Sequence, residues 1–135
     1  MIFAIATAAA VLHSTPYVVD VQHASRNMQA SYVALAKTTT RQIGMAPPTR
    51  PSSESCAWSS EIRIQRTSGD TSRNIGEPVR ISGQERGNCR LRSASIEKKI
   101  GEALNDRQRD LAAVAAADRP LLLAELDASS TQSGK

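Results

Sequence analysis

Hydrophobic and polar positions alternate most regularly between residues 55 and 66. In an extended strand this pattern puts apolar side chains on one face and polar ones, such as Glu61 and Arg63, on the other. Residues 78–82 and 89–92 alternate in the same way, and polar, turn-forming residues separate the three stretches. We therefore predict a three-stranded antiparallel meander with one apolar face. The residues expected on that face are Cys56, Trp58, Ser60, Ile62, Ile64, Val79, Ile81, Cys89 and Leu91.

A helical pattern begins at Ser95, where the spacing of apolar residues changes from two to three and four. We expect this helix to end before Pro120, because proline cannot continue a helix. A short second helix then starts with proline in its first turn. A sheet with one apolar face needs a cover, which the longer helix supplies. The predicted fold class is α+β: a small three-stranded antiparallel sheet covered by a C-terminal amphipathic helix, over residues 55–127.

The remaining segments are predicted from composition and spacing. Residues 15–24 are rich in β-branched side chains and predict a strand, and residues 25–43 predict a helix. Residues 44–54 contain three prolines and predict a linker that divides the N-terminal segment from the rest. Residues 128–135 predict a disordered tail. The apolar residues that carry the helical spacing in the N-terminal segment are Met28, Tyr32, Leu35 and Ala36.

Residues 1–24 also have features of an apolar leader or partial secretion signal. The run from Ile2 to Leu12 is too short to cross a bilayer as a helix, but it suits the apolar region of a signal. Small residues from Ala6 to Ala10 offer an A-x-A cleavage arrangement. No basic residue precedes the run, which a start upstream would explain. We expect an exported protein, periplasmic or secreted; the alternative is a cytoplasmic protein whose N-terminal helix or strand packs in the fold.

The two cysteines, Cys56 and Cys89, both fall on the predicted apolar face. A disulfide between them would stabilise the fold by about 3–4 kcal/mol in the chain-entropy model. In a simple meander the first and third strands lie about 9.5 Å apart, whereas a disulfide needs Cα atoms within about 7 Å. The disulfide thus requires Cys56 to lie just before its strand, or another strand order. Two cysteines without a nearby histidine provide too few ligands for a zinc site, and a nucleophilic cysteine would also need a nearby histidine. Buried free thiols are therefore the main alternative.

The net charge of +4 rests on thirteen arginines and four lysines among 135 residues. This excess favours acidic partners, such as lipid head groups, glycans, acidic proteins or nucleic acid, without separating them. The outward side chains of the three strands form a candidate anion-binding face on which Glu61 is the only acid. The face lacks aromatic residues, which argues against a platform for single-stranded nucleic acid. The alternative is that these arginines only keep the sheet soluble. The candidate residues are Arg63, Arg80, Arg90 and Arg92.

The sequence contains no pattern that predicts catalysis, a cofactor or a metal. His13 and His23 are interpreted as ordinary surface residues, and neither a G-x-S-x-G elbow nor a phosphate-binding glycine loop is present. We predict a small exported, disulfide-stapled, non-catalytic binding or envelope-associated protein without a transmembrane span. The main alternative is a cytosolic regulatory protein whose basic sheet face binds nucleic acid or an acidic partner. An enzyme with an unrecognised site is a third hypothesis.

Overall fold

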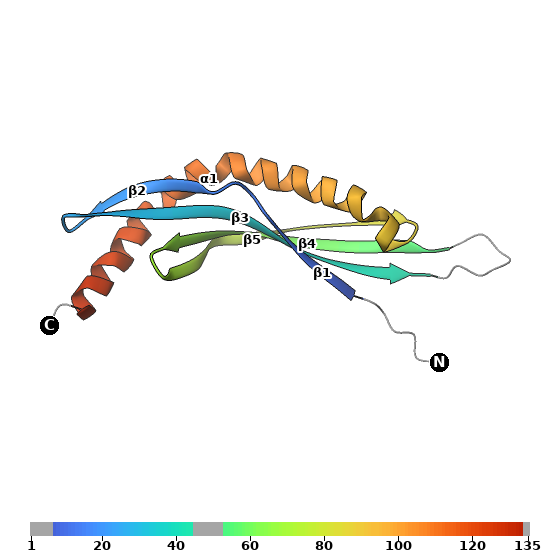
Figure 1. Cartoon of the computed structure of the whole chain (residues 1–135), viewed down its shortest axis with the longest axis horizontal. Coiled ribbons are helices and arrows are strands. Elements are labelled where there is room, and N and C mark those ends of the chain that lie inside the picture. Colours follow the sequence, from blue (N-terminus) through green and yellow to red (C-terminus); the bar gives the residue numbers. More distant parts are fainter. Residues whose placement is uncertain (1–6, 45–52, 134–135) are drawn as a thin grey trace.

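A computed structural model describes residues 7–44 and 53–133. It shows a long, twisted sheet with one long helix lying across one face (Figure 1). The elements are β1 (Thr7–His13), β2 (Tyr17–His23), β3 (Arg26–Ile43), β4 (Ser55–Ser68), β5 (Thr71–Arg86) and α1 (Cys89–Ser133).

The strands form one sheet in the order β1-β3-β4-β5, and every pairing is antiparallel. β2 also pairs with β3, so that β1 and β2 cover successive parts of one edge of β3. Ser14 bridges the interruption between them. Its amide donates to the Ala34 carbonyl oxygen and its hydroxyl accepts from the Ala34 amide, both at 2.9 Å. Pro16, which has no amide hydrogen, then leads into β2.

Two tight turns set the register of the sheet. Between β2 and β3, Ala24 and Ser25 have φ values of 51° and 68°, the pair of positive values that defines a type I′ hairpin turn. Between β4 and β5, Gly69 takes the first of two turn positions with φ 58°, where a type II′ turn requires glycine. Both turn types match the right-handed twist of the strands that they join.

The core lies between α1 and the sheet face that α1 covers. Three of the buried side chains on β3 are small: Ala30, Ala34 and Ala36 are at most 1 % exposed, which lets the helix pack close to the sheet beside the larger Tyr32. The buried residues form two clusters. The first, beside the start of α1, contains Ala34, Ala36, Cys56, Trp58, Ile62, Ile96, Ile100 and Leu104. The second contains Val21, Ala30, Tyr32, Ile64, Leu111, Ala115 and Leu122.

Helix α1 is 45 residues long. Asn88 caps it, because the Asn88 Oδ1 accepts a hydrogen bond from the Arg90 amide at 2.7 Å. The helix bends in its second half, and its C-terminal part descends past one end of the sheet (Figure 1). Pro120 lies inside the helix and explains the bend, since proline removes a helical hydrogen bond and crowds the preceding turn. Over the residues that the structure describes, α1 is not apolar enough to cross a membrane.

The prediction of a helix over 25–43 is wrong, because residues 26–43 form strand β3. Ala30, Tyr32, Ala34 and Ala36 are all buried, which is the two-residue period of a strand. The same stretch also has apolar residues three and four apart. β3 is hydrogen-bonded on both edges, and this tertiary pairing decides between the two periods.

The sheet has five strands instead of the predicted three, although the α+β class is confirmed. Residues 89–92, predicted as the third strand, form the first turn of α1. The long strand β5 replaces a predicted polar loop and one short strand. Asn88 caps the helix that begins at Cys89, so the alternation of apolar and polar residues over 89–92 does not indicate a strand.

The predicted end of the helix before Pro120 is also wrong. α1 continues through Pro120 to Ser133 as one helix, so residues 128–133 of the predicted tail are helical, and residues 134–135 lie outside the described part. Contacts with the sheet after the proline, described below, hold the continuation in place.

The N-terminal segments belong to the same sheet as the rest. β3 and β4 pair over fourteen residues each, across the predicted linker, of which residues 45–52 lie outside the described part. Residues 7–13 and 17–23 of the predicted leader are β1 and β2, and residues 1–6 are likewise outside the description. Ala8 and Ala10 pair with Thr40 and Thr38, so cleavage after either alanine would remove part of β1.

Candidate functional site

Cys56 and Cys89 form the predicted disulfide, with 4.8 Å between their Cα atoms. The two cysteines do not have to span the distance between the first and third strands of a meander, because Cys89 begins α1 and is not part of a third strand. The Gly87 amide donates to the Glu54 carbonyl oxygen at 2.8 Å and brings the start of α1 back to the start of β4. Both cysteines of the chain are bonded, so neither is a thiol nucleophile or a thiolate metal ligand.

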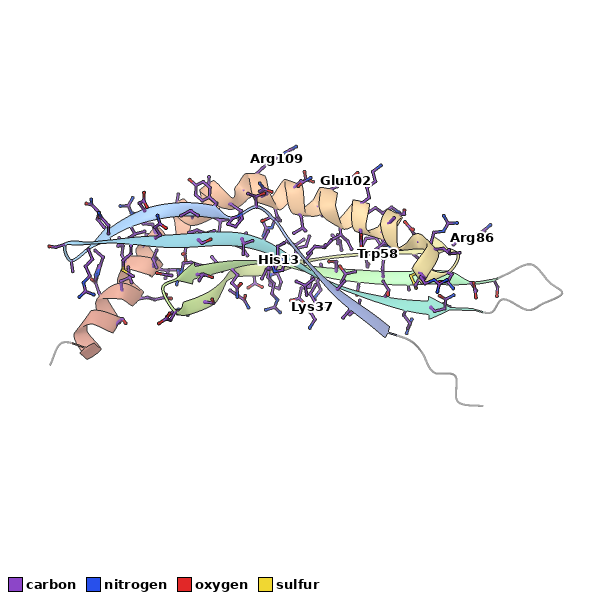
Figure 2. The ribbon with its side chains drawn as sticks, in the orientation of Figure 1. His13, Lys37, Trp58, Arg86, Glu102 and Arg109 are labelled. Atoms are coloured by element: carbon purple, nitrogen blue, oxygen red, sulfur yellow. A yellow bond between two sulfur atoms is a disulfide. The ribbon has the colours of Figure 1, made fainter. Side chains whose placement is uncertain are left out.

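The candidate site is the face of the sheet turned away from α1, which we call the open face. Ala36 and Ile62 are buried under α1, so their neighbours Lys37 and Glu61 point to the opposite side. Figure 2 shows Lys37 on the side of the sheet away from the helix, whereas Arg109 projects from the outer side of α1.

One row of register partners crosses the open face through Val11, Lys37, Glu61 and Arg80. Neighbouring members of the row stand about 4.8 Å apart in backbone position, which is the spacing of paired strands. Arg63, two residues after Glu61 on β4, points to the same side. The sheet therefore gathers three cations around one carboxylate, an arrangement that we call the basic cluster: Lys37, Arg63 and Arg80.

Ion pairs join the two arginines of the cluster to Glu61. The Arg63 Nε donates to the Glu61 Oε1 at 2.5 Å, and the Arg80 Nη2 lies 3.5 Å from the Oε2. The side chains of Arg63 and Arg80 are 47 % and 80 % exposed, and that of Glu61 is 24 % exposed. All three remain within reach of a ligand from solvent.

The predicted set of four arginines is divided between two elements. Arg63 and Arg80 lie together on the open face, whereas Arg90 and Arg92 lie in the first turn of α1. The Arg92 Nε donates to the Arg86 carbonyl oxygen at 2.8 Å and so supports the helix start. Sequence reasoning missed Lys37, because it falls in the segment predicted as a helix.

Exposed apolar side chains lie on the same face as the basic cluster. Val11 and Val18 are 53 % and 54 % exposed, and their register partners on β3 are Lys37 and Ser31. Half-buried Leu35 lies between them along β3. The open face thus presents cations and aliphatic groups side by side.

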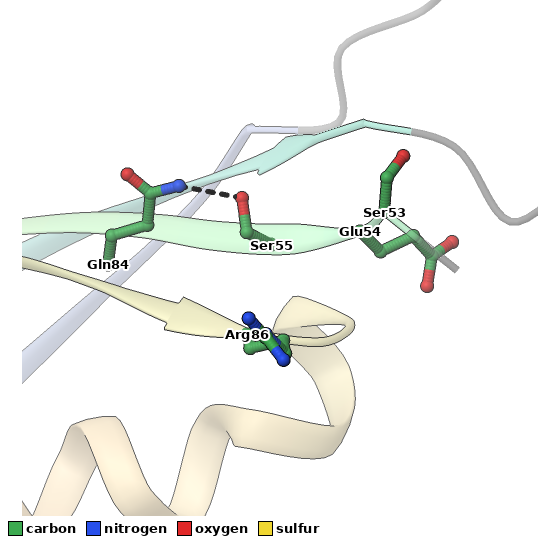
Figure 3. A pocket seen from close by; sticks show the side chains of 5 residues that line it. All are labelled: Ser53, Glu54, Ser55, Gln84 and Arg86. Atoms are coloured by element: carbon green, nitrogen blue, oxygen red, sulfur yellow. Dashed lines mark hydrogen bonds between the residues drawn. The ribbon is translucent and has the colours of Figure 1, made fainter. Parts of the chain in front are cut away.

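A polar hollow of about 630 Å³ opens at the end of the sheet near the disulfide (Figure 3). Ser53, Glu54, Ser55, Gln84 and Arg86 line it, and the Gln84 Nε2 donates to the Ser55 Oγ at 2.8 Å. These five residues include neither a histidine nor a cysteine, and the hollow is open to solvent. We interpret it as the rim of the open face.

A charged cluster that sequence reasoning missed lies under the bent part of α1, and its inner members Tyr32, Arg66 and Asp118 are buried. The Tyr32 hydroxyl donates to the Asp118 Oδ2 at 2.7 Å, and the Arg66 Nη1 donates to the same oxygen at 2.5 Å. Arg66 and Arg73 both contact Glu125. Burial, and secondly the bond to Asp118, raises the pKa of Tyr32 to about 12. Tyr32 therefore keeps its proton, and the cluster fixes the helix to the sheet.

Further polar contacts hold α1 at two other places along its length. The His23 Nε2 lies 2.5 Å from the Asp127 Oδ1, near the C-terminal end of the helix. Near the other end, the Lys99 Nζ donates to the Glu85 Oε1 at 2.6 Å and the Ser95 hydroxyl donates to the same oxygen at 3.0 Å. The bond from Lys99 is the main reason why the pKa of Glu85 is below its usual range.

The described residues contain no group of three or more His, Cys, Asp or Glu side chains that could hold a metal ion. His13 lies on β1 opposite Leu35, and His23 contacts Asp127.

Comparisons with protein-family models, curated proteins and solved structures found no match to this chain. The function must therefore be inferred from the geometry of the open face and from the disulfide.

Proposed function

We propose that this protein is an exported, non-catalytic binding protein that attaches to anionic phospholipid surfaces through its open face. The observation that carries the proposal is the basic cluster, in which Lys37, Arg63 and Arg80 gather on an exposed sheet face around a single acid. Asp20 is also on this side, but it lies towards the far end of β2, opposite Gln29.

The chemistry of the face favours lipid over other anionic partners. Guanidinium groups bind phosphate oxygens in pairs, and each basic residue near an anionic membrane contributes about 1 kcal/mol. Val11 and Val18 supply exposed aliphatic groups that suit the boundary between head groups and acyl chains. A platform for single-stranded nucleic acid would instead need aromatic side chains on which bases stack.

The disulfide supports the exported location. Disulfides persist in secreted and periplasmic proteins and are rare where thiols are kept reduced. Cys56 is completely buried and belongs to the first core cluster, so the bond is part of the packed interior. In the cytosol, which is the alternative location, the disulfide would be reduced and this cluster would contain two thiols.

The test is sedimentation of the protein with vesicles of phosphatidylglycerol and of phosphatidylcholine at low salt. We expect binding to the anionic vesicles only, and at least tenfold weaker binding by the double variant Lys37→Glu/Arg80→Glu, because it reverses two of three cations. Binding should also weaken as salt is added, since exposed charges are screened.

The matched control is Lys98→Glu/Arg109→Glu. It changes the net charge equally, but both residues are exposed on α1, and Arg109 lies on its outer side (Figure 2). Equal loss in the two double variants would mean that net charge, not the open face, attracts the membrane. Preference for nucleic acid over vesicles in competition would favour the cytosolic alternative.

A further inference from the structure

We propose that Glu61 is an internal competitor for the anion, occupying the basic cluster until a lipid phosphate displaces it. This inference rests on the proposed function and adds a regulatory residue to the same face. The Glu61 carboxylate takes the place among Lys37, Arg63 and Arg80 that the head group would take.

The geometry places Glu61 at the centre of the cluster. Lys37 is its register partner on β3 and Arg80 is its register partner on β5, so cations stand on both neighbouring strands. Its two carboxylate oxygens are divided between Arg63 and Arg80. An incoming phosphate that used either guanidinium in a bidentate manner would meet an acceptor already present.

The contacts of Glu61 are of the kind that a ligand can replace. Its partners are 47 % and 80 % exposed, and ion pairs in such surroundings contribute little to stability. The Arg80 contact, at 3.5 Å, is long for a charge-assisted hydrogen bond. Rotation of the Glu61 side chain into solvent frees the arginines without moving the backbone of β4.

Glu61 also has a role in the free protein that explains its presence. Opposite charges that stand directly across neighbouring strands are stabilising. Glu61 stands opposite Lys37 on β3 and opposite Arg80 on β5. Loss of this carboxylate should therefore lower stability slightly while it strengthens anion binding, and a purely structural role predicts only the first effect.

The experiment compares Glu61→Gln with Glu102→Gln in the vesicle assay, using increasing fractions of phosphatidylglycerol in phosphatidylcholine. Glu102 projects from the outer side of α1, so its variant makes the same charge change away from the open face (Figure 2). We expect Glu61→Gln to bind about fivefold more tightly than the wild type and to bind at a lower anionic fraction. Glu102→Gln should stay within twofold of the wild type.

The outcomes separate this inference from the proposed function. If the wild type binds anionic vesicles but Glu61→Gln matches Glu102→Gln, the competitor role is overturned and the binding face stands. If neither the wild type nor Glu61→Gln binds, both are overturned. Binding by Glu61→Gln alone would show that Glu61 blocks the face, but it would overturn both the displacement of Glu61 by this lipid and the proposed function.

Discussion

Gly83 and Trp58 are register partners on β5 and β4, and the indole ring lies where a side chain at position 83 would be. A Cβ atom on Gly83 would come within 2.8 Å of three atoms of the ring. Trp58 is only 7 % exposed, so its ring cannot move away without leaving the first core cluster. At this position glycine is needed for space, and its backbone freedom is secondary.

We predict that Gly83→Ala lowers the free energy of unfolding by about 1–3 kcal/mol, because the added methyl group overpacks the indole. Urea denaturation followed by circular dichroism measures this. The control is Gly101→Ala, since nothing lies within 4 Å of a Cβ at this helical position. It should raise stability by up to about 1 kcal/mol. An unchanged Gly83→Ala midpoint would show that the ring does not pack on Gly83.

Among single residues, those of β4 were predicted best. The alternation from Cys56 to Gln65 assigned Arg63 and Glu61 to the outward face, and the structure agrees. Asp118 and Arg66 were not found, because no local pattern marks a pair 52 residues apart. The buried acid Asp118 would have been noticed only if the helix had been predicted to continue through Pro120.

At the scale of elements, strand β3 shows why local periodicity was insufficient. Alanines suit either period, because a small apolar residue fits a helix face or a sheet face equally well. Only pairing with β1, β2 and β4 excludes the helix. The class of the fold could be predicted from β4 and α1, whose patterns are long, whereas the strand count depended on segments with few large apolar residues.

The hairpin turn between β2 and β3 is built from unfavourable residues. Ala24 and Ser25 both adopt positive φ, which side chains with a Cβ rarely do. We predict that Ala24→Asn/Ser25→Gly raises the free energy of unfolding by roughly 1 kcal/mol, since this pair is preferred in type I′ turns.

Thermal unfolding of this double variant, compared with the wild type, measures the effect. Replacement of the same two residues by Val should lower the midpoint, because a β-branched side chain is least compatible with positive φ. A lower midpoint for the Asn-Gly variant would contradict the assignment of the turn.

At the scale of the whole molecule, the disulfide and the charged cluster hold α1 at widely separated points along its length. The disulfide fixes its first residue, and Asp118 and Glu125 fix the part around the bend. The stretch between them packs mainly through apolar side chains. This arrangement leaves the opposite face of the sheet to the basic cluster.

We predict that removing the disulfide by Cys56→Ala/Cys89→Ala lowers the free energy of unfolding by about 3–4 kcal/mol, the chain-entropy value for the 33-residue separation. Urea denaturation measures the change, and reduction of the wild type should reproduce most of it. In protein made in its own host, both cysteines should resist alkylation until reductant is added. Full labelling without reductant would contradict both the bond and the exported location.

The two core clusters carry different natural chromophores. The single tryptophan, Trp58, belongs to the cluster beside the disulfide, whereas Tyr17 and Tyr32 face each other across β2 and β3 at the other cluster. Indole fluorescence therefore follows melting at one end of the sheet and phenol absorbance follows the other. Coincident curves would mean that the elongated protein unfolds as a single cooperative unit, and separated curves would mean that its halves melt independently.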